Sequence, residues 1–140
     1  MRIITKFVIF IPMMFAAHIF SFAESVAIVT SSKVPYSQDV VSGLKDGLSA
    51  ALPQCSIDII SSDTSDYMTT LKDKKYLAIC VVGQGVVKIA QALPDVPVIF
   101  SMVPESASGE LARLCNDPDR NITGVFLSAD PAAQIAIIKK

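Results

Sequence analysis

The sequence predicts an α/β protein with a doubly wound, open parallel sheet of about five strands and helices on both faces, preceded by a signal peptide. Two observations support this fold class. Short β-branched runs alternate with longer segments of helical periodicity along the chain. The first run, over 26–30, is continuously apolar, as expected for a strand that is covered on both faces. Right-handed crossovers between such parallel strands place the connecting helices on both sides of the sheet.

The first 23 residues are predicted to be a signal peptide and not part of the fold. Arg2 and Lys6 precede an apolar run over 7–20, which is followed by the small-x-small pattern Ser21-Phe22-Ala23. The apolar run is shorter than the roughly 20 residues that span a bilayer. We expect cleavage after Ala23 and export of the chain, with an uncleaved membrane anchor as the alternative.

The first strand and the helix that follows it are well marked. "VAIVT" over 26–30 is a continuous apolar run, and residues 36–52 carry an apolar stripe of helical spacing that Pro53 ends. Gly43 and Gly47 lie one helical turn apart in this helix. Each costs about 1 kcal/mol relative to alanine. We attribute them to close packing of the helix on the sheet.

The same strand and helix unit recurs along the rest of the chain. Apolar runs predict strands over 56–61, 76–83, 96–101 and 122–126. Helical spacing predicts helices within 62–75 and over 84–93, 105–114 and 130–140. Ser65 or Asp66 would cap the first of these helices, and Asp130 with Pro131 would open the last.

Charge and residue counts exclude several classes of function. Without Arg2 and Lys6, ten of the 12 basic residues remain against 13 acidic ones, so the chain lacks the basic face that nucleic acids need. The single histidine, His18, lies in the predicted signal peptide, which excludes histidine-activated catalysis in the processed chain. The acidic residues are too scattered for a metal site. We therefore expect no enzyme activity, cofactor, metal or nucleic-acid partner.

The three cysteines show no paired spacing. Cys80 lies in the apolar run "LAICVV" and is expected to pack as a small hydrophobic residue. Cys55 and Cys115 could form a disulfide in an oxidising compartment or remain free thiols.

The loops after the predicted strands provide the candidate binding site. In open parallel sheets, ligands bind beyond the carboxyl ends of the strands, and we therefore consider the loops after the first, third and fourth strands. Hydroxyl groups after the first strand could hold a carboxylate together with helix amides, or could merely cap the helix. The candidate ligand-binding residues are Ser31, Ser32, Tyr36, Gly83, Gln84, Gly85, Ser101 and Met102.

Three segments also carry a resemblance to a known family. They are "VAIVTSSKVPYSQDVVSGLKDGL" over 26–48, "LPDVPVIFSMVPES" over 93–106 and "NITGVF" over 121–126. In this order and spacing they resemble the exported substrate-binding proteins of ABC transporters whose better-known members take up tryptophan and other aromatic amino acids. The sequence departs from the family pattern at Pro104-Glu105 and at "CNDPDR" over 115–120.

The resemblance implies a type I periplasmic binding protein, in which two α/β lobes close on a ligand. Residues 24–127 would form the N-terminal lobe, and 128–140 a helix leading toward a second lobe that is missing from the sequence. The same eight candidate residues would contact a small ligand such as an aromatic amino acid. The implied partner is an ABC permease, and the implied location is a bacterial periplasm or extracytoplasmic surface. The alternative is a single-lobe interaction or sensor module that forms a homodimer or binds another partner.

Overall fold

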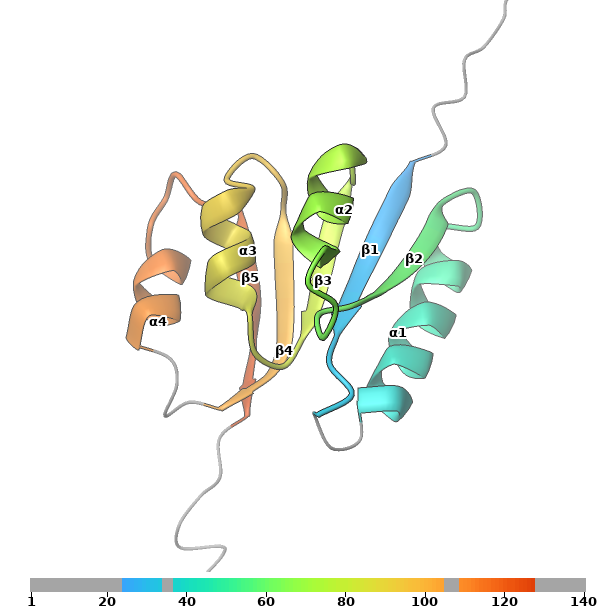
Figure 1. The fold of residues 1–140 in the computed structure, drawn as a ribbon, viewed down its shortest axis with the longest axis horizontal. Helices are drawn as coiled ribbons and strands as arrows, with labels where there is room; N and C mark the ends of the chain where they lie inside the picture. The colour runs from blue at the N-terminus through green and yellow to red at the C-terminus, as the bar shows by residue number, and fades with distance from the viewer. Residues whose placement is uncertain (1–23, 34–36, 105–108, 128–140) are drawn as a thin grey trace, which may run out of the picture.

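The computed structural model describes residues 24–33, 37–104 and 109–127 (Figure 1). Three sequence-based predictions therefore lie outside the described residues: the signal peptide over 1–23, the ligand contact of Tyr36 and the helix over 130–140. None of the helices in the described ranges has the length and hydrophobicity of a membrane span.

The described chain alternates strands and helices in the predicted order. The strands are β1 (Ser25–Thr30), β2 (Ser56–Ser61), β3 (Ala78–Val82), β4 (Val98–Pro104) and β5 (Ile122–Leu127). The helices are α1 (Ser37–Ala51), α2 (Tyr67–Asp73), α3 (Val86–Ala92) and α4 (Gly109–Cys115). The predicted α/β class is therefore confirmed.

The five strands form one parallel sheet in the order β2-β1-β3-β4-β5. The chain moves from β1 to β2 in one direction, and then crosses back over β1 to add β3, β4 and β5 on the other side. The strand order thus reverses between β1 and β3. In sheets of this kind, the crevice for a ligand opens at the carboxyl ends of the strands at such a reversal.

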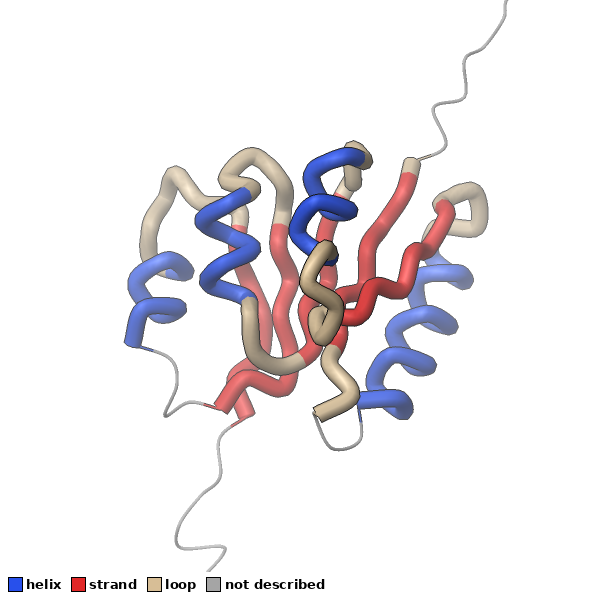
Figure 2. The backbone as a smooth tube through the Cα atoms, in the orientation of Figure 1, coloured by secondary structure: helices blue, strands red, loops and turns tan. Residues whose placement is uncertain are grey.

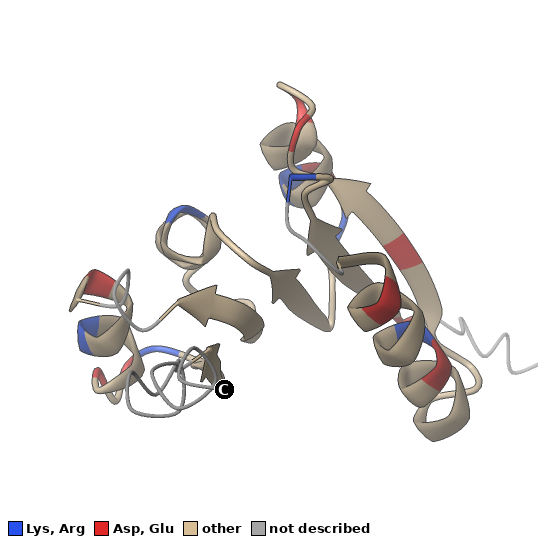
Figure 3. Cartoon of the chain, turned by 90° about the horizontal axis from the view of Figure 1, so that it is seen from below, with Lys and Arg blue, Asp and Glu red and all other residues tan. Residues whose placement is uncertain are grey.

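The helices cover the two faces of the sheet unequally. Helix α1 packs on one face over β1, β2 and β3 through Val41, with Cys80 and Val82 below it. Helices α2, α3 and α4 contribute Leu71, Ile89 and Leu111 to the larger core on the opposite face. Seen along the strands, α1 lies on one side of the twisted sheet and the other helices on the other side (Figure 3). Charged residues lie mainly on helices and loops in this view.

The sheet face on the α1 side remains uncovered over β4 and β5 within the described residues. Side chains alternate between the two faces along a strand, and Phe100 and Ile122 belong to the core on the other face. Ile99, Val125 and Leu127 therefore face the α1 side, where they are 44%, 71% and 55% exposed. This leaves an exposed apolar strip beside a well-packed core.

Three local predictions are corrected by the structure. Gly43 and Gly47 do not pack on the sheet, because both lie on the exposed side of α1 and a methyl group at either position would meet nothing within 4 Å. Helix α3 begins at Val86 and not at Gln84, since Gly83 and Gly85 adopt positive φ angles of 90° and 102°. Strand β4 continues past Ser101 to Pro104.

The cysteines are all free among the described residues, so Cys55 and Cys115 do not form a disulfide. Cys55 precedes β2 at one edge of the sheet, and Cys115 ends α4 beside β5 at the other. Four strand spacings of about 4.8 Å separate these edges, whereas bridged cysteines need Cα atoms within about 7 Å of each other. Cys80 is buried at 4% exposure and packs as a small hydrophobic residue, as predicted.

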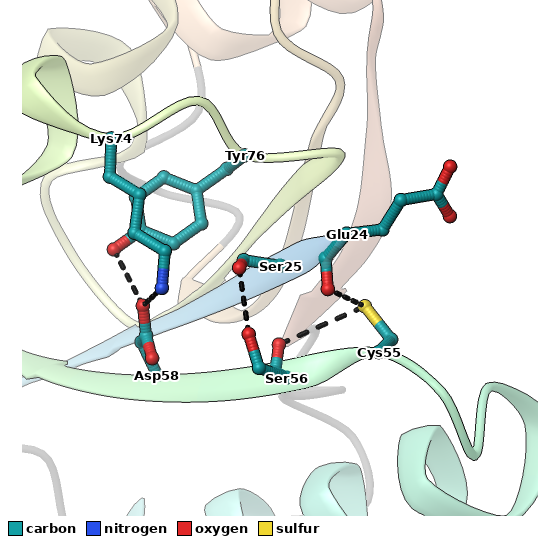
Figure 4. Close-up of polar contacts among 7 residues, drawn as sticks. All are labelled: Glu24, Ser25, Cys55, Ser56, Asp58, Lys74 and Tyr76. Carbon is teal, nitrogen blue, oxygen red and sulfur yellow. Dashed lines mark hydrogen bonds and ion pairs between the residues drawn. The ribbon is translucent and has the colours of Figure 1, made fainter. Parts of the chain in front are cut away.

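Polar contacts join the starts of β1 and β2, where Ser25 Oγ and Ser56 Oγ lie 2.7 Å apart, and join β2 to the segment before β3 (Figure 4). The Asp58 carboxylate on β2 accepts hydrogen bonds from Lys74 Nζ at 2.5 Å and from Tyr76 Oη at 2.9 Å. Burial of the Tyr76 ring, reinforced by the hydrogen bond to Asp58 and its charge, raises the pKa of Tyr76 to about 12. The hydrogen bond from Lys74 lowers the pKa of Asp58, against a smaller opposing effect of burial.

We expect Tyr76 to ionise late, because its pKa is raised to about 12. Because its pKa in the folded state lies above the ordinary value of 10.0, its contribution to stability is complete below pH 10.0 and is lost as the pH rises toward 12. A spectroscopic titration of phenolate absorbance should show a late step near pH 12. That step should be absent in Tyr76→Phe and move to lower pH in Asp58→Asn. A step near pH 12 that persists in Tyr76→Phe would contradict the contact between Tyr76 and Asp58.

Candidate functional site

A cavity of about 650 Å³ lies at the carboxyl edge of the sheet. The loops that follow β1, β2 and β3 lie next to one another at this edge (Figure 2). The lining residues are Ser31, Lys33, Ser62, Asp63, Tyr67, Gly83, Gln84, Gly85, Met102, Pro104 and Leu127. They come from both sides of the β1–β3 reversal in strand order, which is where this fold class places its ligands.

The cavity lining combines a polar and an apolar part. Ser31, Lys33 and Asp63 supply hydroxyl, ammonium and carboxylate groups from the loops after β1 and β2. Tyr67 at the start of α2 and Leu127 at the end of β5 supply apolar surface. Such a lining, mostly apolar with a few polar groups in fixed positions, is typical of small-molecule sites.

The Asp63 carboxylate is held firmly by the loop after β1. Its Oδ1 accepts a hydrogen bond from Ser31 Oγ at 2.7 Å, and its Oδ2 accepts bonds from the Ser32 amide and from Ser32 Oγ, both at 2.8 Å. The bond from the Ser31 hydroxyl, followed by those from the Ser32 amide and hydroxyl, lowers the pKa of Asp63 to about 2. The group is therefore a carboxylate in a fixed position at any physiological pH.

The loop between β3 and α3 forms a second wall of the cavity. Gly83 and Gly85 have φ angles of 90° and 102°, which residues other than glycine rarely adopt. The Gly83 amide donates a hydrogen bond to the Ser101 carbonyl at 2.8 Å and so fixes this loop to β4. Between the two glycines, Gln84 is exposed on the cavity wall.

Met102 enters the cavity from an irregular point of β4. The pairing of β4 with β5 shifts register between Phe100 and Val103, and Met102 in this bulge has a φ of 58°. A left-handed conformation costs a non-glycine residue about 1 kcal/mol or more. β-bulges occur next to functional sites, where they redirect a side chain. Here the bulge directs Met102 toward the cavity and the α1-side core.

The structure brings five of the eight predicted site residues together on the cavity wall: Ser31, Gly83, Gln84, Gly85 and Met102. Ser32 does not line the cavity but supports Asp63. The Ser101 hydroxyl is buried, and no hydrogen-bond partner for it lies among the described residues. For the hydroxyls of Ser31 and Ser32 the sequence left two roles open, holding a ligand carboxylate or capping the helix, and in the structure both hydroxyls bind the carboxylate of Asp63.

The sequence-based prediction missed the contribution of the loop after β2. Ser62 and Asp63 line the cavity from this loop, which we had not considered as a binding loop. The available signal was the end of the second predicted strand at Ser61, because parallel strands all end at the same edge. Lys33, Tyr67, Pro104 and Leu127 were missed as well.

Comparisons with protein-family models, with curated proteins and with solved structures found no match to this chain. Within residues 24–33, 37–104 and 109–127, no group of three or more His, Cys, Asp or Glu side chains is placed to hold a metal ion.

Proposed function

We propose that this chain is an extracytoplasmic solute-binding protein of an ABC importer, or the N-terminal lobe of one, and that it binds a small ligand such as an amino acid. The observation that carries the proposal is the cavity of about 650 Å³ at the reversal of strand order. Its volume lies in the range of about 300–1,000 Å³ that is common for small-molecule sites. The resemblance of three sequence segments to aromatic amino-acid-binding proteins agrees with this position.

The residues that line the cavity suit reversible binding of a ligand without a chemical reaction. Asp63, Gln84 and Leu127 are exposed although they line the cavity. A ligand held by this edge alone keeps part of its surface in water, which limits its affinity. A second surface that closes over the ligand would remove this limit, as two-lobed binding proteins do. The ABC permease of the proposal would recognise the loaded, closed form.

We expect isothermal titration calorimetry of the chain to detect binding of tryptophan, tyrosine or phenylalanine. Leu127→Ala and Leu77→Ala form a matched pair, because the leucines are 55% and 46% exposed and only Leu127 lines the cavity. Leu127→Ala should weaken binding by about 1 kcal/mol, roughly five-fold, through lost apolar contact. Leu77→Ala should leave it unchanged. Absence of binding for all three amino acids, or equal effects of the two variants, would reject the proposal.

The exposed strip on β4 and β5 favours a second candidate function, a single-lobe module that forms a homodimer. No charged residue occurs in either strand, so two copies would meet without electrostatic repulsion, and large exposed apolar patches commonly mark interfaces. Sedimentation analysis should then show a dimer that Val125→Lys converts to a monomer. A monomeric unchanged chain would exclude this candidate.

A further inference from the structure

We propose that the cavity binds its ligand with a cationic amino group against Asp63, and that the carboxylate of an amino-acid ligand points toward Lys33. This inference rests on the proposed function and assigns the orientation of the amino-acid ligand in the cavity. It differs from one of the two roles that the sequence left open for the serines after β1, in which they hold a ligand carboxylate.

The hydrogen-bond donors of the β1 loop are already engaged by an internal anion. Ser31 Oγ and both donors of Ser32 bind the two oxygens of Asp63 at 2.7–2.8 Å. A ligand carboxylate at these serines would compete for the same donors and would meet the charge of Asp63. Like charges in close contact are unfavourable. Ser31 and Ser32 are therefore closed to an anionic group, and Lys33 is the group of this loop that can attract one.

The same contacts prepare Asp63 for a cation. Three hydrogen bonds fix both carboxylate oxygens, yet Asp63 remains exposed and lines the cavity. A carboxylate oxygen accepts up to two hydrogen bonds. Oδ2 already accepts two, but Oδ1 accepts only one and can still accept from an ammonium group. Because the carboxylate is held in place before binding, little conformational entropy is lost when the ligand arrives.

The rest of the lining defines the remainder of the ligand. Lys33 lies on the same wall, and its positive charge contributes to the low pKa of Asp63. The wall therefore presents one negative and one positive group, which complements a zwitterion. Tyr67, Met102 and Leu127 supply apolar surface for a side chain. The ligand class is an α-amino acid with an apolar or aromatic side chain.

Three indole compounds distinguish the contribution of the ammonium group to binding from that of the carboxylate. Tryptophan carries both charges, tryptamine only the ammonium, and indolepropionate only the carboxylate. We expect the chain to bind tryptophan and tryptamine in calorimetry. Asp63→Asn should weaken both by at least about tenfold, as expected for lost hydrogen bonds between charged groups, and should not weaken indolepropionate. Lys33→Gln should weaken tryptophan but not tryptamine.

Asp66→Asn is the matched control. Asp66 is exposed, lies three residues from Asp63, makes no side-chain capping bond and does not line the cavity. Asp66→Asn changes the net charge by the same amount as Asp63→Asn but removes no group from the cavity wall. Ligand binding should therefore stay unchanged in Asp66→Asn. Equal effects at Asp63 and Asp66, or binding of indolepropionate in preference to tryptamine, would overturn the inferred orientation while the proposed binding function stands. If none of the three compounds binds, the proposed function fails and the orientation fails with it.

Discussion

A Gly124→Ala variant is expected to be less stable than the unchanged chain by at least about 2 kcal/mol. Gly124 on β5 pairs with Phe100 on β4 in the parallel register. A methyl group at this position would overlap the Phe100 carbonyl oxygen and lie 2.5 Å from Cγ and 2.7 Å from Cδ1 of its ring. The carbonyl belongs to the backbone of a paired strand, so it cannot move aside without disturbing the pairing of β4 and β5.

Urea denaturation monitored by circular dichroism would measure this loss as a lower midpoint. Gly43→Ala is the matched control, because a methyl group there meets nothing within 4 Å on the exposed side of α1. The control should gain roughly 0.5–1 kcal/mol, since alanine favours the helix. Equal stability of Gly124→Ala and the unchanged chain would show that β4 and β5 are not paired as described.

The same pair of glycines shows what the sequence can and cannot predict. Runs of apolar and β-branched residues predicted all five described strands. Burial on both faces explains the continuous apolar signal of β1 and β3, whereas β2 and β5 are largely exposed. The packing of a glycine depends on residues far away in the chain. Gly43 and Gly47 are spaced by one helical turn, which suggested close packing, but both face solvent. Gly124 shows no such spacing, yet it packs against Phe100. Local spacing cannot distinguish these two situations.

The sequence predicted those residues of the candidate site that lie at or near the ends of the predicted strands. The loops after β1 and β3 supplied Ser31 and Gly83–Gly85, and the bulge within β4 supplied Met102; all of these residues line the cavity. Asp63 lies 32 positions from Ser31 and 31 positions from Ser32 in the sequence, and the three residues are in contact only in the folded chain. It depends on β2 lying beside β1, and the alternation of strands and helices does not determine the order of strands in the sheet.

The second large effect is expected at Phe100 itself. Phe100 is 2% exposed and is the largest of the fully buried side chains. Its ring also contacts that of Phe126, with centroids 4.9 Å apart and planes inclined by 57°. Phe100→Ala should therefore lower the free energy of unfolding by about 3–5 kcal/mol, through lost apolar burial and the cavity left behind. Phe126→Ala should cost less, because Phe126 is only partly buried.

A double variant tests whether the ring of Phe100 excludes a side chain at position 124. Phe100→Ala is the suitable partner, because it removes Cγ and Cδ1, the two side-chain atoms that a methyl group at position 124 would meet. In this background Gly124→Ala should cost less than in the unchanged chain, since only the overlap with the carbonyl oxygen of residue 100 remains. Residues in contact commonly show such coupling, with magnitudes of about 0.5–3 kcal/mol. Strict additivity in urea denaturation would instead assign the whole cost of Gly124→Ala to the backbone of β4.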